Sequence, residues 1–322
     1  MTNENRDWKI FTGTRTPHDD LTRLPAAPPW RPFAPGEQPS SPSPLGSGKA
    51  AERDNKLGAA FVPTPPMIDA VNAALYLRRP LLLTGRPGVG KSSLIRAVAR
   101  ELNLGVVLDW SITSRSTLKE GIYEYDALGR LYEKRPIGEF VTLGPLGLAM
   151  MESTWPRALL IDEIDKADLD LPNDLLNIFE KGEYTIPELA RAKEQVVLAR
   201  SCQNLPPVEI KEGRIECRQF PFVVLTSNGE REFPAPFLRR CIRLEVPEPS
   251  VEELGNIVAS HFDDAIRKDA TTLIEQFEKR RKDGQLASDQ LLNAIFLTHA
   301  GVQLGDDRDE KSLQSGILKK LV

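Results

Sequence analysis

The sequence predicts an α/β protein in which a parallel sheet is followed by a small helical domain. Short apolar stretches alternate with helical stretches between residues 57 and 247, and this alternation is typical of a parallel sheet covered by helices. After Pro247 and Pro249 the strand pattern stops and helical segments follow. We therefore expect a proline-rich N-terminal segment and linker over residues 1–56, an α/β domain over 57–247 and a helical domain over 248–322.

The N-terminal segment is interrupted by prolines, each of which removes a backbone donor and disfavours a helix before it. Residues 34–50 have the composition of a flexible or extended linker. Upstream of them lie apolar side chains that a plain spacer does not need: Trp8, Ile10, Phe11, Trp30 and Phe33. Two interpretations stay open. The segment is a disordered tail with incidental aromatics, or its apolar residues dock on the protein's own surface or on a partner.

The elements of the α/β domain follow in a regular order. Apolar runs bounded by turn residues predict strands over 81–83, 105–110, 157–163, 221–228 and 241–246. Proline starts, helical periodicity and proline or glycine stops predict helices over 66–78, 92–104 and 170–182. Residues 111–155 combine glycines with alternating stretches, so we expect hairpin-like insertions there.

A phosphate-binding loop is predicted between the first strand and its helix. The pattern GxxxxGK[ST] is matched at every fixed position by Gly85, Arg86, Pro87, Gly88, Val89, Gly90, Lys91 and Ser92. The glycines permit a tight turn that turns backbone N–H groups toward phosphate oxygens. Lys91 is expected to reach the β- and γ-phosphates and Ser92 to ligate Mg²⁺, with Ser93 as the next residue of the nucleotide site.

Two acids end the apolar strand of residues 157–163. Asp162 is expected to hold Mg²⁺ directly or through water, and Glu163 to polarise the attacking water. The strand of residues 221–228 ends in Asn228, whose amide is placed to hold that water and the γ-phosphate. The alternative for Asn228 is a plain turn, because Asn-Gly is a strong turn dipeptide.

The order of the segments GRPGVGKS, LLIDEIDKAD, VVLTSN and FLRRC resembles that of AAA+ ATPases. The GPLG segment, DEIDKAD and the run Pro-Ala-Pro-Phe-Leu-Arg-Arg are similar to the MoxR-like branch. The resemblance covers roughly residues 57–322. It implies a P-loop NTPase core with a helical lid, ATP and Mg²⁺ as ligands, and a homo-oligomeric ring, usually a hexamer.

The resemblance also implies an arginine that acts in trans on the neighbouring subunit's nucleotide. Arg239 matches that position best and Arg240 is the second candidate. Such an arginine stabilises charge on the transferring γ-phosphoryl group and makes hydrolysis depend on assembly. The alternative is that both are solvated residues before an edge strand.

Two departures from the family pattern stand out. Many relatives carry an arginine at the start of the third lid helix, whereas residues 286–291 of this chain hold none. Lid closure on ATP is therefore expected to be weaker or differently arranged. Residues 181–220 form an enlarged hairpin region, which in related rings faces the pore or a client. A decorative surface insertion is the alternative.

The adenine base has no reader that the sequence identifies uniquely. Phe61 and Val62 lie where similar ATPases pass the chain beside the base. No guanine motif of the Asn-Lys-x-Asp kind follows a predicted strand, so ATP is favoured over GTP.

Composition bounds the partners and the compartment. The 322 residues include 42 Lys and Arg against 46 Asp and Glu, a net charge of −4, which makes nucleic acid an improbable main partner. Cys202, Cys217 and Cys241 form neither an even disulfide set nor a CxxC pair, as expected in a reduced compartment. No stretch approaches the roughly 18 apolar residues of a membrane span, and the N-terminus has no signal core. We expect a cytoplasmic protein.

Three functions stay open. The first is an ATP-hydrolysing ring that remodels or activates a separate protein, because MoxR-like relatives commonly act on proteins with von Willebrand factor A domains, some within bacterial multi-component defence systems. The second is a nucleic-acid motor or loader. The third is a nucleotide-gated scaffold with little turnover, suggested by the missing lid arginine.

Overall fold

The structure is a computed structural model that describes residues 8–31, 46, 48–192, 194–261, 273–275, 277 and 288–299. The chain divides into two compact units. The first unit comprises Met1–Ala59, Pro63–Thr84 and Ser92–Leu244, and the second comprises Ala60–Val62, Gly85–Lys91 and Glu245–Val322. Residues up to Ala59 are thus grouped with the α/β part of the chain. The domain boundaries at residues 56 and 247 stay a prediction.

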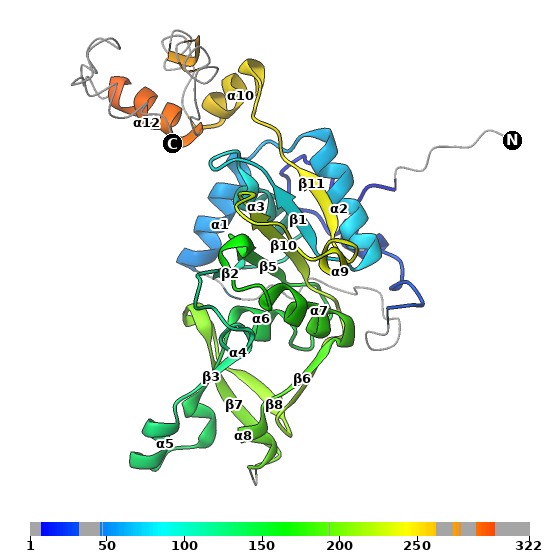
Figure 1. Ribbon diagram of the computed structural model, residues 1–322, viewed down its shortest axis with the longest axis vertical. Helices are drawn as coiled ribbons and strands as arrows, with labels where there is room; N and C mark the ends of the chain where they lie inside the picture. Colours follow the sequence, from blue (N-terminus) through cyan, green and yellow to red (C-terminus); the bar gives the residue numbers. More distant parts are fainter. Residues whose placement is uncertain are drawn as a thin grey trace, which may run out of the picture. The chain divides into compact units, whose positions relative to one another are not determined.

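The first unit contains the predicted sheet (Figure 1). Its strands are β1 (Leu81–Thr84), β2 (Leu108–Ser111), β5 (Ala158–Asp162), β10 (Phe222–Ser227) and β11 (Ile242–Glu245), in the order β11-β1-β10-β5-β2. The pairs β1–β10, β10–β5 and β2–β5 are parallel. β10 is buried along its whole length, as a central strand covered on both faces should be. The α/β fold with a parallel sheet is confirmed.

The predicted helices over 66–78 and 170–182 are found within one residue at each end, the one over 92–104 ends three residues early, and one further helix was not predicted in full. These helices are α1 (Lys49–Ala60), α2 (Pro65–Leu77), α3 (Lys91–Glu101) and α7 (Leu171–Lys181). α2 starts on proline and ends at a left-handed Arg78, and α7 ends at a left-handed Gly182.

Helix α1 is the one not predicted in full, because its residues 49–56 were assigned to the N-terminal segment and linker. Asp54 of α1 is 4% exposed and accepts hydrogen bonds from Arg96 Nε (3.2 Å) and Val107 N (3.0 Å). A Cβ on Gly58 would lie 2.4 Å from the Arg96 carbonyl oxygen. Long-range pairing with α3 therefore holds this helix, and hydrophobic periodicity does not report such pairing.

The two insertions predicted as hairpins form one second sheet. Its strands are β3 (Tyr123–Tyr125), β4 (Val141–Leu143), β6 (Glu183–Thr185), β7 (Val196–Ser201), β8 (Val208–Lys211) and β9 (Arg214–Glu216), in the order β3-β4-β7-β8-β9-β6. β3 and β4 pair antiparallel, as do β7 and β8. β4 and β7 pair in parallel, so the two insertions are joined. Between β3 and β4 lies the short helix α5 (Ala127–Tyr132).

Shorter helices complete the first unit. They are the 3-10 helices η1 (Asp20–Arg23), η3 (Ile137–Phe140), η4 (Ile164–Lys166) and η5 (Cys202–Asn204), and the α-helices α4 (Leu118–Ile122), α6 (Pro145–Ala149), α8 (Pro187–Ala190) and α9 (Ala235–Leu238).

Residues 8–31, which we call the N-terminal strap, pack onto the first unit. Ile10 and Phe11 are fully buried, and so is Leu21. Trp8 is 44% exposed and meets Tyr76 edge to face, whereas Trp30 is 70% exposed. The strap therefore docks on the protein's own surface through its buried aliphatic residues and Phe11, with an edge contact from the half-exposed Trp8, while Trp30 stays exposed. Phe33 and most of the expected linker lie outside the described residues.

The second unit contains α10 (Val251–His261) and α12 (Ser288–His299). Leu254, Val258, Phe277, Leu291 and Ile295 contribute to its buried apolar cluster. Ser288 to Leu291 open α12, whereas Leu286 and Ala287 lie outside the described residues. In the described part of the chain, no helix combines the length and the apolar character that crossing a membrane requires.

Candidate nucleotide site

The predicted phosphate loop lies in the second unit, in the chain between β1 and α3. Gly85, Gly88 and Gly90 have φ of 152°, 78° and 88°, values that residues with a Cβ rarely adopt. The Lys91 ammonium donates to the carbonyl oxygens of Gly85 (2.7 Å) and Arg86 (2.9 Å), and Lys91 is 7% exposed. The loop thus has its lysine folded back over its own backbone.

The short segment Ala60–Val62 belongs to the same unit as this loop. A Cβ on Gly90 would lie 2.8 Å from Phe61 Cε2, so the Phe61 ring packs closely on the loop. Val62 is 42% exposed. Of the two residues expected beside the base, Phe61 therefore contacts the loop and Val62 faces solvent.

In the first unit, Ser92 and Asp162 meet as the sequence predicted. Asp162 Oδ1 accepts hydrogen bonds from Ser92 Oγ (2.7 Å) and Thr226 Oγ1 (2.5 Å). β5 and β10 are parallel neighbours, so their carboxyl ends bring Asp162 and Thr226 to one edge of the sheet. The donor set consists of a carboxylate and hydroxyl oxygens, which fits Mg²⁺ because this ion prefers oxygen ligands.

Glu163 follows directly and has an unusual backbone. Its φ of 59° and ψ of 47° lie in the left-handed region, which is uncommon and costly for a residue with a Cβ. Its N–H donates to Thr226 Oγ1 (2.9 Å), and its Oε1 lies 3.5 Å from Asn228 Nδ2. The sequence-predicted pair Glu163 and Asn228 is therefore brought together, at the outer limit of a hydrogen bond.

Lys166 is a member of this cluster that the sequence analysis did not single out. Its ammonium donates to Glu163 Oε2 at 2.6 Å. This hydrogen bond is the main reason that the pKa of Lys166 is raised above its ordinary value. Asn228 and Lys166 thus hold the two oxygens of one carboxylate. The 3-10 turn η4, which follows Glu163, brings Lys166 back over it.

Asp165 belongs to the DEIDKAD segment, and no role was predicted for it. Its side chain organises the loop after β10. It is 2% exposed, and its Oδ2 accepts from the N–H groups of Asn228 (2.9 Å) and Glu230 (3.1 Å). Its Oδ1 is buried without a hydrogen-bond partner among the described residues. Asp165 therefore fixes the backbone of Asn228. The signal that the sequence offered was a third acid, two residues after Glu163.

Arg239 and Arg240 follow α9 and differ in their surroundings. Arg240 Nε is paired with Glu180 Oε1 of α7. The Arg239 side chain is exposed and has no ion pair within the described ranges, while its carbonyl oxygen accepts from Arg79 Nη1 (3.1 Å). Arg79, for which no role was predicted, thus holds the backbone of Arg239. The guanidinium of Arg239 stays exposed to solvent.

Within the first unit, the fold and these residues define an α/β protein with an acidic and hydroxyl-rich cluster at the carboxyl edge of its parallel sheet. The AAA domain family, dynein-related subfamily, matches residues 80–240, half of the chain. The chain belongs to this family, and nucleotide binding with ATPase activity is what the family implies in general. This match does not show whether the chain belongs to the MoxR-like branch.

A relative from Rhodococcus erythropolis carries the description "ATP-dependent protease ATP-binding subunit-like protein". The two sequences are 29% identical over 195 residues, covering 56% of this chain and 54% of the relative. The chain thus spans about half the length of this curated relative. The similarity agrees with membership of the AAA+ ATPases.

Proposed function

We propose that this protein is a Mg²⁺-dependent ATPase of the MoxR-like type that works as a homo-oligomeric ring on a separate protein. The observation that carries the proposal is the cluster of Ser92, Asp162, Glu163, Thr226 and Asn228. It presents oxygen ligands suited to Mg²⁺ beside a carboxylate and an amide suited to a water molecule.

Each residue has a proposed role. The backbone of residues 85–90 and the Lys91 ammonium bind the phosphates, Ser93 follows in the helix, and Phe61 and Val62 lie on the adenine side. Ser92 and Asp162 hold Mg²⁺, which when bound neutralises charge on the β- and γ-phosphates. Glu163 accepts a proton from the attacking water, which Asn228 orients.

Arg239 is the proposed trans-acting arginine. Its outward guanidinium supports this choice over Arg240, whose side chain is engaged by Glu180 within the same subunit. An arginine that reaches the neighbouring subunit's γ-phosphate stabilises the transition state and couples hydrolysis to assembly. We propose a ring of six subunits, following the family resemblance.

The output is proposed to be remodelling or activation of a protein client, possessing for example a von Willebrand factor A domain, in the cytoplasm and within a bacterial multi-component defence system. The relative's description as an "ATP-dependent protease ATP-binding subunit-like protein" supports a motor that serves another chain. A scaffold with little turnover is the second candidate, because residues 286–291 carry no lid arginine.

The test compares Lys91→Ala and Glu163→Gln with the parent protein. Loss of the Lys91 cation should abolish tight ATP binding, whereas Glu163→Gln should bind ATP and hydrolyse it slowly. Proteins captured with the Glu163→Gln variant in ATP then identify the client. Normal ATP affinity of Lys91→Ala would refute the phosphate site, and parent turnover by Glu163→Gln would remove Glu163 from the mechanism. A parent protein that binds ATP without measurable turnover would favour the scaffold.

A further inference from the structure

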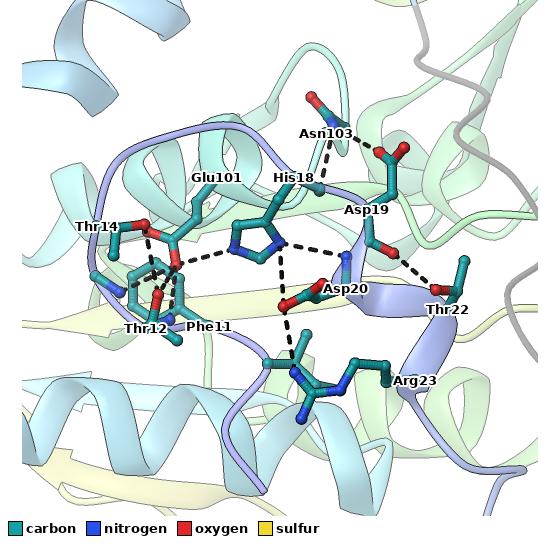
Figure 2. A network of polar contacts seen from close by, with 12 residues as sticks. Phe11, Thr12, Thr14, His18, Asp19, Asp20, Thr22, Arg23, Glu101 and Asn103 are labelled. Carbon is teal, nitrogen blue, oxygen red and sulfur yellow. Dashed lines mark hydrogen bonds and ion pairs between the residues drawn. The ribbon is translucent and has the colours of Figure 1, made fainter. Parts of the chain in front are cut away.

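The N-terminal strap is anchored by a buried carboxylate on α3. Glu101 is fully buried, and it accepts hydrogen bonds from the N–H groups of Thr12 (2.7 Å), Gly13 (3.0 Å) and Arg15 (2.8 Å), and from Thr12 Oγ1 (3.0 Å). His18 Nε2 lies 3.4 Å away on the same carboxylate (Figure 2). Because a buried charge without partners is costly, these donors fix the path of residues 12–18 firmly.

The anchored strap holds the chain just before the segment Ala60–Val62. Arg15 Nη1 donates to the carbonyl oxygen of Ala59 (3.2 Å), the residue before Ala60. Arg15 is itself fixed, since its carbonyl oxygen accepts from Arg100 Nε (2.9 Å) of α3. The end of α1 is therefore tied to the strap and to α3.

The strap also holds the chain just after that segment. Gly13 has a φ of 78°, and a Cβ there would lie 2.8 Å from Pro63 Cγ and 3.0 Å from Ile68 Cδ1. Only glycine permits this approach without a shift in the backbone or in Pro63. Residues 59 and 63 are thus both contacted by strap residues that Glu101 holds in place.

We propose that the N-terminal strap positions the adenine side of the nucleotide site by holding both ends of Ala60–Val62. The proposal rests on the ATP-binding function proposed above, in which Phe61 lies beside the base. A three-residue segment held at both ends loses little further conformational freedom when a base binds against it. Phosphate contacts, by contrast, belong to the glycine-rich loop and do not involve the strap.

The experiment separates the base from the phosphates. Binding of MgADP and of magnesium tripolyphosphate is measured by calorimetry for the parent, Gly13→Ala and Arg15→Ala. Both variants should weaken MgADP binding by about 3- to 10-fold, because the segment must be ordered on binding. Tripolyphosphate affinity should stay within about twofold, since it needs only the loop. If Gly13→Ala fails to fold, Arg15→Ala alone still tests the proposal.

Matched controls separate this result from general damage and from failure of the site itself. Arg23→Ala removes another strap arginine, one that pairs with Asp20 inside the strap, and should leave both affinities unchanged. Folded strap variants with parent MgADP affinity, or with equal loss for both probes, would overturn the proposal. Lys91→Ala should lose both probes, and its retention of both would instead refute the phosphate site.

Discussion

The side chain of Asn72 pairs with the backbone of Phe11 as a neighbouring strand would. Asn72 Oδ1 accepts the Phe11 N–H at 3.0 Å, and Asn72 Nδ2 donates to the Phe11 carbonyl oxygen at 2.7 Å. The same oxygen accepts the Ile10 N–H at 2.7 Å. Asn72 is fully buried on α2, so one amide satisfies three backbone groups that docking of the strap removes from water.

Asn72→Ala should lower the free energy of unfolding by roughly 2–4 kcal/mol, because it leaves the N–H groups of Ile10 and Phe11 and the Phe11 carbonyl buried without partners. Urea unfolding followed by circular dichroism measures the change. Asn173→Ala, at an exposed position of α7, is the matched control. A loss no larger than that of the control would show that the pairing of Asn72 with the strap contributes nothing to stability.

Lys166→Met should reduce ATP hydrolysis about tenfold while the KM for ATP stays near the parent value. Lys166 contacts Glu163 and no phosphate group is assigned to it, so its loss disorders the carboxylate that receives the proton. Lys166→Arg should restore part of the rate. Steady-state kinetics give both constants, with Lys181→Met as an exposed lysine control. An unchanged kcat would mean that the ion pair is incidental.

Arg239→Ala should leave MgADP binding by isolated subunits intact and depress hydrolysis in the assembled ring about a thousandfold. Mixing it with Lys91→Ala subunits should recover activity, since some interfaces then join a complete site to an intact arginine. ATPase titrations of the mixtures report this. Arg240→Ala removes a half-exposed ion pair with Glu180 and should cost less than about 1 kcal/mol in stability. If Arg240→Ala lost ATP hydrolysis and Arg239→Ala kept it, Arg240 would be the trans-acting arginine.

The cysteines should react slowly with iodoacetamide at pH 8. Burial raises the pKa of Cys217 and Cys241 to about 12 and that of Cys202 to about 11. A raised pKa keeps these thiols protonated at pH 8, and the thiolate is the reactive form. Mass spectrometry should find native modification more than about tenfold slower than in urea. Equal rates for Cys202 in both states would contradict the raised pKa of this half-buried thiol.

The sheet and the phosphate loop were predictable because their signals are contiguous. Each strand of the parallel sheet is a short apolar run, and the loop is a single motif. The pairing of Ser92 with Asp162 followed from knowing that Asp162 ends a parallel strand and that Ser92 lies at the start of the helix after the phosphate loop, at the same edge of the sheet. Helix α1 was missed because Asp54 is held by Arg96 and Val107, partners remote in sequence.

The remaining parts of the site depend on contacts that no local pattern reports. Lys166 reaches Glu163 across the 3-10 turn η4, and that turn follows a left-handed Glu163. The sequence of a non-glycine residue does not indicate a left-handed backbone. The apolar residues of the N-terminal segment were predicted as possible anchors without an order among them. Ile10 and Phe11 are the buried ones, because the amide oxygen of Asn72 accepts the N–H groups of both.

The pairing of β4 with β7 gives the two insertions a shared mechanical behaviour. Thr142 and Leu143 lie in register with Arg200 and Ser201, so the hairpin that carries α5 cannot swing while its neighbour stays still unless these hydrogen bonds break. A load applied at α5 is therefore borne by β7 and β8 as well. The two insertions are therefore expected to move as one body, so that a displacement of either one displaces the other.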